Sequence, residues 1–184
     1  MTDQIHIPPP RVTLFDMSRP GEEDSTLPLQ FNPTEYKRKI QVNYSRLAPI
    51  GQPHEVLQYR GTSNQVITMS MFFLARGIGT ATVCDDAKSW MESLCYPRRS
   101  VTTIKGGAPP DVLLVWPSDL TMTVKLMSVN ESNERFFKTS AGAMQMTLAV
   151  TFEEVRNSRW TLEQARRYGG RRSPPLVDPF NPAR

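Results

Sequence analysis

An alternation of apolar and polar side chains toward the C-terminal end of the chain constrains the fold more than any other feature. In the stretch Ala143–Val155 the apolar side chains fall on every second position, at Met144, Met146, Leu148, Val150 and Phe152. A period of two puts them on one face of an extended strand, whereas the same spacing on a helix would spread them around the cylinder. The stretch therefore predicts a long β-strand with one buried face.

A second stretch, Leu120–Val129, alternates in the same way and predicts the partner of that strand. The alternation slips where Leu126 is followed directly by Met127, and a β-bulge at this point would account for the slip. The polar residues Asn130–Arg135 are expected to form a turn between the two strands. We therefore interpret the pair as a long antiparallel hairpin or meander, with one face in the core and one in water.

One helix is predicted with a clear apolar stripe. Within Asp85–Cys95 the apolar residues are Ala87, Trp90, Met91, Leu94 and Cys95, at the spacing of one helix face. Such a helix normally packs onto a sheet, so Trp90 is expected in the core. Further strands are expected over residues 11–16, 27–32, 40–45, 56–59, 65–75 and 111–117, the last one buried on both faces, and one helical turn over residues 34–39.

These elements predict a mainly β fold, either a barrel or a sandwich of long antiparallel strands, with one packed helix and extended arms. The 184 residues suit one domain with appendages. We expect an N-terminal arm and first strand over residues 1–26, a β domain over residues 27–155 and a basic C-terminal arm over residues 156–184. The 16 prolines gather at the ends and in connections, which favours such arms.

Residue types that carry catalysis or bind metals are scarce and scattered. His6 and His54 are the two histidines, each beside prolines, and no CxxC or HxxxH pattern accompanies them. Cys84 and Cys95 have no histidine close in sequence, and we expect reduced, buried thiols rather than a disulfide. The sequence therefore predicts no enzyme, no metal and no cofactor.

Two further patterns have structural interpretations. Six of the nine methionines occupy predicted strand positions between Met69 and Met146. They could make a pliable binding surface, but their regular alternation favours ordinary filling of the core. No apolar run approaches the ~20 residues that span a bilayer, and Met1–Pro10 lacks the features of a signal peptide, so no membrane partner is expected.

The basic charge is concentrated in the tail. From Arg156 onward seven arginines face two acidic residues, which gives 7 − 2 = +5, so the preceding 155 residues carry 4 − 5 = −1. The pairs Arg166-Arg167 and Arg171-Arg172 could dock a partner, lie in solvent or contact phosphate backbones. Partner docking is favoured, because the tail has few aromatic residues between its arginines and no nucleic-acid motif accompanies it.

Four short segments follow one another in a characteristic order: Leu27–Pro33 (LPLQFNP), Leu57–Gly61 (LQYRG), Pro110–Trp116 (PDVLLVW) and Thr147–Val155 (TLAVTFEEV). With the strands and helix between them, they resemble the tube-type structural proteins of contractile injection systems and long-tailed phages. Members of that family often show FQFNP, a paired LxFxG, PPxVxFxWG and a final xVxLTFxEV. The resemblance covers about residues 27–155, and it departs from the family where Pro117, not glycine, follows the tryptophan.

The resemblance implies a structural protein that joins the tail tube and spike hub to the baseplate, assembles as a homo-oligomeric ring and docks its neighbours through its arms. Several family members carry a C-terminal LysM module. The segment after Val155 is too short for one, so we expect the basic tail to substitute for it. The implied location is the tail or baseplate of a virion, after synthesis in the host cytoplasm, with no membrane or nucleic-acid partner.

Two alternative functions stay open at this point: a tube terminator or tube–sheath adaptor, and, from another class, a nucleic-acid-binding packaging accessory. Phosphate binding should weaken by orders of magnitude between low and moderate salt, whereas ring contacts built on strand edges should persist. The candidate interface residues lie in the first family-like segment and in the tail: Phe31, Asn32, Pro33, Tyr36, Arg166, Arg167, Arg171 and Arg172.

Overall fold

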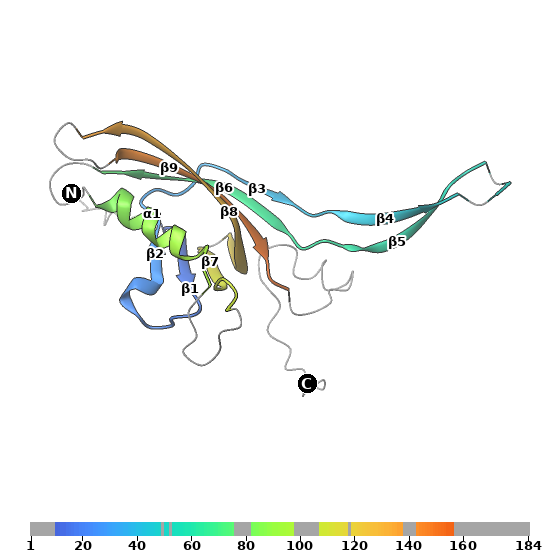
Figure 1. Cartoon of the computed structure of the whole chain (residues 1–184), viewed down its shortest axis with the longest axis horizontal. Helices are drawn as coiled ribbons and strands as arrows, with labels where there is room; N and C mark the ends of the chain where they lie inside the picture. The colour runs from blue at the N-terminus through green and yellow to red at the C-terminus, as the bar shows by residue number, and fades with distance from the viewer. Residues whose placement is uncertain are drawn as a thin grey trace, which may run out of the picture.

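A curved antiparallel sheet of seven strands forms the body of the protein, and a two-stranded ribbon projects from it (Figure 1). The structure is a computed structural model that describes residues 10–48, 50–51, 53–75, 82–97, 107–117, 119–137 and 143–156. The helices and strands are β1 (Thr13–Asp16), η1, a 3₁₀ helix (Glu23–Ser25), β2 (Thr26–Pro28), β3 (Tyr36–Lys39), β4 (Val42–Leu47), β5 (Val56–Thr62), β6 (Val66–Leu74), α1 (Val83–Ser93), β7 (Val112–Trp116), β8 (Leu120–Phe136) and β9 (Ala143–Glu154). The body sheet has the strand order β2-β1-β7-β8-β9-β6-β3, and β4 and β5 form the ribbon.

The predicted hairpin of β8 and β9 is confirmed near the centre of the body sheet. Along β9 every second side chain from Met146 to Phe152 is buried, as the alternation requires. The predicted bulge is confirmed as well. Leu126 lies opposite Phe152, the register shifts before Ser128, and Met127 between them has an exposed side chain. The bulge keeps the apolar residues on both sides of it facing the core.

The predicted turn at Asn130–Arg135 is wrong. These residues continue β8 as far as Phe136 and pair with the first half of β9. All of their side chains are exposed, so the polar composition that suggested a turn belongs to a strand whose far end lies in solvent. Arg135, with a φ of 55°, is the residue of this stretch that leaves the extended region.

The predicted helix is confirmed as α1, which begins at Val83 and packs against β6 and β9. Its face toward the sheet buries Cys84, Ala87 and Met91. Trp90 packs at the margin of the core. Its Nε1 donates a hydrogen bond to the backbone oxygen of Asp24, at 2.8 Å. The tryptophan thus ties the helix to the loop that precedes β2.

The expectation of two buried thiols is half wrong. Cys84 lies in the helix and is buried, and burial raises the pKa of its thiol. Cys95 is exposed. The helix ends at Ser93, so the helical spacing that would have turned Cys95 toward the sheet no longer applies there. Both cysteines are free, as expected.

The predicted helical turn over residues 34–39 is also wrong, because Tyr36–Lys39 form β3, an edge strand paired with β6. Its sequence, YKRK, has no alternation of apolar and polar residues that would predict a strand. Three of its four side chains are exposed. Charged side chains on an edge strand also discourage unwanted pairing with another chain. Pairing with β6, which the local sequence does not reveal, determines this element.

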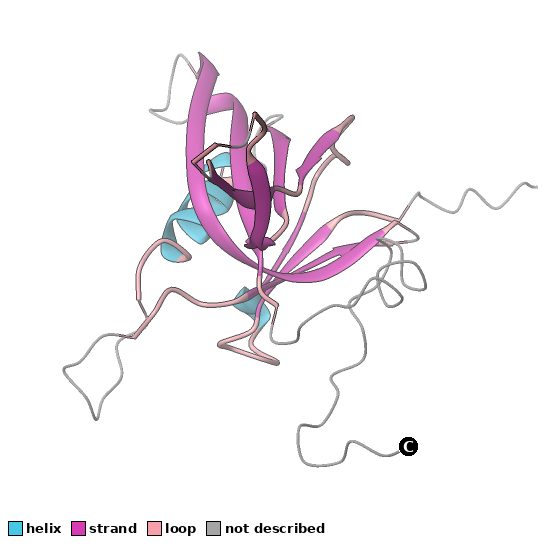
Figure 2. Ribbon diagram, turned by 90° about the vertical axis from the view of Figure 1, so that its right-hand side faces the viewer, coloured by secondary structure: helices cyan, strands magenta, loops and turns pink. Residues whose placement is uncertain are grey.

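The core lies between the curved sheet and α1 (Figure 2). Its largest fully buried side chains are those of Leu14, Leu29, Ile67, Met71, Phe73, Met91, Leu94, Leu114, Leu120, Met146, Leu148 and Phe152. Four of the six strand methionines, Met69, Met71, Met122 and Met146, are among the buried residues, as core filling predicts. β7 has two fully buried side chains, Val112 and Leu114, and its other three are half-buried, so it is close to the expected strand buried on both faces.

The mainly β fold with one packed helix is therefore confirmed. Of the two expected architectures, the sandwich is the better description. The sheet curls into a sandwich-like shape and does not close into a barrel. In the described part of the chain its end strands, β2 and β3, do not pair with each other. The predicted N-terminal arm to residue 9 and the predicted C-terminal arm from residue 157 lie outside the described residues.

Candidate functional site

The ribbon of β4 and β5 is the most exposed part of the described chain. We call residues 40–62 the arm. The arm continues the β3–β6 pair of the body outward, beyond the edge of the core (Figure 1). At about 3.3 Å per residue, the seven residues of β5 span ~23 Å. Gly51, with a φ of 84°, lies in the turn at its tip, where a left-handed backbone suits glycine.

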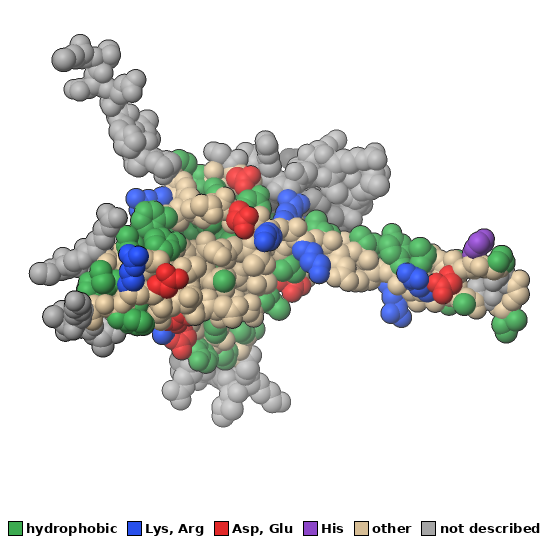
Figure 3. All heavy atoms as spheres, turned by 90° about the horizontal axis from the view of Figure 1, so that it is seen from above, with side chains coloured by type: hydrophobic (Ala, Val, Ile, Leu, Met, Phe, Trp, Pro, Cys, Tyr) green, Lys and Arg blue, Asp and Glu red, His purple; other side chains and the backbone are tan. Residues whose placement is uncertain are grey.

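Large apolar side chains line the arm although no core lies beneath it. Seven of them, Ile40, Val42, Tyr44, Leu47, Val56, Leu57 and Tyr59, are 46–60% exposed, and Ile50 at the tip is fully exposed. The space-filling view shows apolar and basic side chains along the projecting arm (Figure 3). Single exposed apolar residues are ordinary on a protein surface, but a contiguous set marks an interaction site.

The register of the two strands sorts these side chains onto two faces. Tyr44 lies opposite Tyr59, with ring centroids 6.0 Å apart, and Leu57 lies opposite Arg46. The register shifts between Asn43 and Tyr44, so Val42 and Thr62 stay on the same side as the tyrosines. The Tyr59 and Thr62 hydroxyls are hydrogen-bonded at 2.9 Å, in agreement with that placement. We call Val42, Tyr44, Leu57 and Tyr59 the aromatic face of the arm.

Polar contacts at the base hold the arm to the body. Arg156, just after β9, donates from Nε to Glu154 Oε2 at 2.6 Å and from Nη2 to Gln65 Oε1 at 3.3 Å. Asn64 Nδ2 donates to Glu153 Oε1 at 3.1 Å. Glu154 and Gln65 are buried, so this hydrogen-bonded group fixes the point where the chain leaves the arm and enters β6.

A second candidate region is the segment Leu29–Pro33, which we call the seam. It runs along the part of β6 that β3 leaves unpaired. Gln30 Nε2 donates to the Leu74 backbone oxygen at 3.0 Å, and the Leu74 N–H donates to Gln30 Oε1 at 2.7 Å. The side-chain amide thus replaces a neighbouring strand at the end of β6. Unpaired strand edges attract other chains, and the seam covers this one.

The seam is also bonded to the segment that leads into β1. The Leu29 N–H donates to the Val12 backbone oxygen at 2.9 Å. The Val12 N–H in turn donates to Asn32 Oδ1 at 2.9 Å, and Asn32 Nδ2 donates to the Pro10 backbone oxygen at 3.0 Å. Hydrogen bonds from both ends of the seam therefore join the β2 side of the sheet to β6, across the gap that keeps the barrel open.

Aromatic contacts support the same junction. The Phe31 and Phe72 ring centroids are 5.7 Å apart, and those of Tyr36 and Trp116 are 5.4 Å apart. Because Tyr36 belongs to β3 and Trp116 to β7, the second contact spans the curve of the sheet. Burial and a hydrogen bond to Asp119 raise the pKa of the Tyr36 hydroxyl above its ordinary value.

The predicted interface residues separate into two groups. Asn32 and Pro33 are half-buried and buried, and they lie with Phe31 in the seam, close to Tyr36 at the start of β3. Phe31 is the exposed member of this group. The four tail arginines, Arg166, Arg167, Arg171 and Arg172, lie outside the described residues. Contact of either group with a neighbouring chain stays a prediction.

The sequence analysis missed the aromatic face of the arm. A signal was present: IQVNYS and EVLQYR are two alternating stretches separated by a Pro/Gly-rich connection, which is the pattern of a hairpin. Strands were predicted over residues 40–45 and 56–59, but their pairing with each other outside the core was not. The structure places them on a ribbon with no second layer, which local alternation does not distinguish from a packed strand.

The described residues hold no group of three or more histidine, cysteine or acidic side chains able to bind a metal ion. No helix in that part of the chain is long and apolar enough to cross a membrane. Most ion pairs of the described residues lie at the surface, such as Lys88 Nζ to Glu131 Oε1 at 3.0 Å, which links α1 to β8. The pair of Arg156 with the buried Glu154, at the base of the arm, is the exception. The geometry points to contact surfaces as the functional feature of the described chain.

Comparison with known proteins agrees with the resemblance seen in the sequence. The profile of a family described as "Contractile injection system tube protein" matches residues 11–161. Among solved structures, the chain is similar to one in the "Cryo-EM structure of the anti-feeding prophage (AFP) baseplate, 6-fold symmetrised". That similarity has a TM-score of 0.37 and 11% identity, and it covers 84% of this chain and 96% of the other. No curated protein sequence matches.

The family match spans the body sheet, the seam, the arm and α1, so it includes every element described above. The suspected relationship to tube-type proteins is confirmed. The chain belongs to the contractile injection system tube protein family and is a structural component of a phage tail or contractile injection machine.

Proposed function

We propose that the protein is a non-enzymatic ring subunit at the junction where the tail tube and spike hub meet the baseplate. The observation that carries the proposal is the arm, a ribbon whose apolar side chains have no core to cover. Two-stranded hairpins are marginally stable alone in water, so such a ribbon is expected to gain its order from a neighbouring protein. Family membership supports a neighbour within the tail.

The body is suited to a static structural role. The seam covers the free end of β6, and the aromatic pair of Tyr36 and Trp116 fastens the curve of the sheet. A fastened sheet presents its remaining surface in a fixed geometry, as a repeating subunit of a closed ring requires. Homo-oligomers with a head-to-tail contact form rings when the rotation between subunits closes.

The experiment has two readouts. Sedimentation velocity of the purified full-length chain, followed by negative-stain electron microscopy, is expected to show closed rings of one copy number. Cross-linking mass spectrometry on intact injection particles is expected to link this chain to tube, spike-hub and baseplate proteins. A chain that stays monomeric at all concentrations and yields no cross-links to these proteins would refute the proposal.

The same particles locate the protein along the tail. Antibody labelling is expected at the baseplate end and nowhere else. Labelling at the opposite end would instead identify a tube terminator, and labelling along the whole tube would identify a tube–sheath adaptor. In infected or producing cells the free chain is expected in the cytoplasm before the tail assembles.

A further inference from the structure

The arm and the rest of the described chain have opposite charge. Residues 35–62, the arm with β3 at its base, carry five basic and two acidic residues, a net charge of +3. The other described residues sum to −7, and the segments outside the described ranges contribute +8, which together give the total of +4. Residues 40–62 contribute +1 of this charge, and residues 35–39, which include β3, contribute +2. The arm and β3 together are therefore the basic part of the described structure, and the arm projects away from the acidic part.

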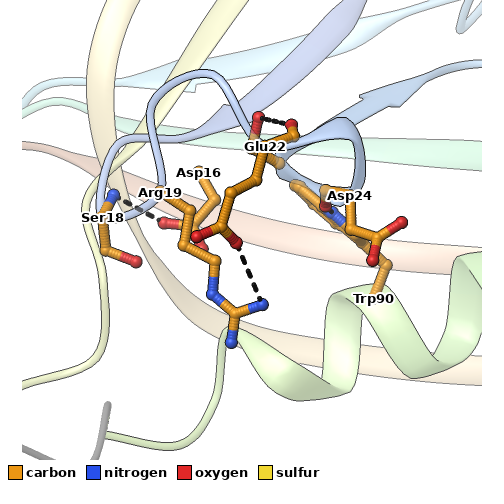
Figure 4. Close-up of polar contacts among 7 residues, drawn as sticks. Asp16, Ser18, Arg19, Glu22, Asp24 and Trp90 are labelled. Atoms are coloured by element: carbon orange, nitrogen blue, oxygen red, sulfur yellow. Dashed lines mark hydrogen bonds and ion pairs between the residues drawn. The ribbon is translucent and has the colours of Figure 1, made fainter.

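Part of the acidic charge lies on a surface formed by two elements. The loop over residues 16–24 has four acidic side chains against Arg19, a net −3, and α1 has three against Lys88, a net −2. Figure 4 shows the loop lying beside α1, with Trp90 of the helix bonded to the backbone of Asp24 in the loop. We call this the helix–loop surface.

The helix–loop surface has the properties of an acceptor for the arm. Asp24, Asp85 and Glu92 are exposed on it. The same two segments contain two exposed apolar side chains: Met17 lies in the loop and Tyr96 follows the helix, at 50% and 62% exposure. The loop is fixed against the helix by the Trp90 bond, so the surface exists before a partner arrives. A set of exposed acidic and apolar side chains is complementary in charge and polarity to the aromatic face of the arm and the basic residues beside it.

The two surfaces lie at different ends of the long axis. In Figure 1 the arm extends from one side of the body, whereas α1 and the loop before β2 lie toward the other. The arm continues β3 and β6 away from the body, so it does not lie against α1 of its own chain (Figure 1). A second copy placed end to end, however, presents its helix–loop surface to the arm.

We propose that the aromatic face of the arm docks on the helix–loop surface of the next copy of this chain. The contact is heterologous, arm to helix, so repetition generates a ring or a filament rather than a two-fold dimer. The apolar side chains of the arm supply affinity, and the charges select orientation and speed association. This inference rests on the proposed ring and names the two surfaces that build it.

Charge reversal on each surface tests the proposal. The arm variant reverses Lys39 at the end of β3 and Arg60 in the arm (Lys39→Glu with Arg60→Glu), which changes the charge of residues 35–62 from +3 to −1. The acceptor variant reverses three acidic side chains (Asp24→Lys, Asp85→Lys and Glu92→Lys), which changes the charge of the helix–loop surface from −5 to +1. All five side chains are exposed, and none of them forms an ion pair among the described residues. Neither variant replaces a residue of the seam or a buried side chain. The control variant, Glu134→Lys with Arg135→Glu, reverses two exposed charges at the far end of β8.

Each variant alone is expected to raise the dissociation constant for self-association at least tenfold, since like charges then face each other across the contact. An equimolar mixture of the two variants is expected to assemble with an affinity close to the wild type, because an acidic arm then meets a basic acceptor and the reverse. The resulting rings have an even copy number. The control variant is expected to assemble like the wild type.

Several results would overturn the inference and leave the proposed ring intact. One such result is that the acceptor variant forms rings as well as the wild type does, each measured alone. Another is a mixture no better than the separate variants. A duplex oligonucleotide that binds the arm while both variants still form rings would assign the arm to nucleic acid. A wild type that never forms rings would remove the ring proposal itself.

Circular dichroism of each variant tests whether it is folded. If the acceptor variant does not fold, Asp24→Asn with Glu92→Gln serves as a milder acceptor pair.

Discussion

The body and the arm are built from the same kind of alternating strand, but the apolar face is buried in the body and exposed in the arm. In the body, β9 places Met146, Leu148, Val150 and Phe152 against a second layer, and all four are buried. In the arm, β4 and β5 place Val42, Tyr44, Leu57 and Tyr59 on one face, and all four are exposed. An apolar stripe therefore stabilises the fold only where another element covers it.

This difference predicts where stability and assembly are encoded. Substitutions in the body are expected to change the free energy of unfolding of the single chain. Substitutions on the arm are expected to change self-association and to leave that free energy nearly unchanged. Because oligomerisation raises apparent stability by mass action, unfolding must be measured at concentrations where the chain is a monomer.

The largest expected effect is that of Phe152→Ala. Its side chain is fully buried between Ile67 of β6 and Leu126 of β8 in the register of the sheet. Removing the ring leaves a cavity in the core and is expected to cost about 3–5 kcal/mol. Urea denaturation followed by circular dichroism measures the loss. A loss below ~1 kcal/mol would mean that the centre of β9 is not the core that the structure describes.

The next largest effect is expected from Gln30→Ala in the seam. The substitution leaves the N–H and C=O of Leu74 without their partner, at a cost of about 1–3 kcal/mol. Denaturant unfolding of the variant is compared with that of Gln58→Ala, which removes the same side chain from the exposed face of β5. Equal stability of the two variants would show that the seam does not fasten the sheet.

A smaller change in stability, but a large change in assembly, is expected from Tyr59→Ala on the arm. Because the side chain is 60% exposed, the unfolding free energy of the monomer should change by no more than about 0.5 kcal/mol. Sedimentation velocity at rising concentration should nevertheless show weaker self-association. A variant that assembles like the wild type would contradict a role for the aromatic face.

The smallest expected effect depends on pH. Burial raises the pKa of the Glu131 carboxyl, but hydrogen bonds from Lys88 and Asn133 and the charge of Lys88 more than offset it, so this pKa lies below its ordinary value. The carboxylate therefore stabilises the fold above the ordinary pKa, and the contribution disappears as pH falls through the lowered one.

Glu131→Gln tests that dependence. The difference in unfolding free energy between wild type and variant should be present above about pH 5 and should vanish toward about pH 3. Thermal or urea unfolding at a series of pH values measures it. Because the pair lies at the surface, high salt should reduce the difference as well. A difference that grows as pH falls would contradict the assigned direction.

Several features of the fold follow from local sequence because their cause is local. The alternation along residues 143–155 predicted β9, and the slip at Leu126-Met127 predicted the bulge, since both depend on which side of a strand a residue points. The apolar stripe of α1 likewise placed Ala87 and Met91 against the sheet. Short motifs identified the family, which the match over residues 11–161 confirms.

Other features depend on which strands become neighbours. The segment YKRK became β3 because β6 offers it a free edge, and residues 130–135 stayed extended because β9 is long enough to pair with them. Gln30 and Asn32 act in the seam through backbone groups far away in sequence, at Leu74, Val12 and Pro10. No local pattern encodes such partners.

The sequence by itself therefore determined which face of each strand is apolar, where the helix lies and which family the chain belongs to. Only the tertiary structure decided whether an apolar face is covered. In the body a curved sheet and a helix close over it, whereas β4 and β5 project past the edge of that sheet and keep theirs exposed. The physical reason is that alternation in the sequence determines which face of a strand a side chain lies on. Whether that face is buried depends on which other elements of the fold pack against it.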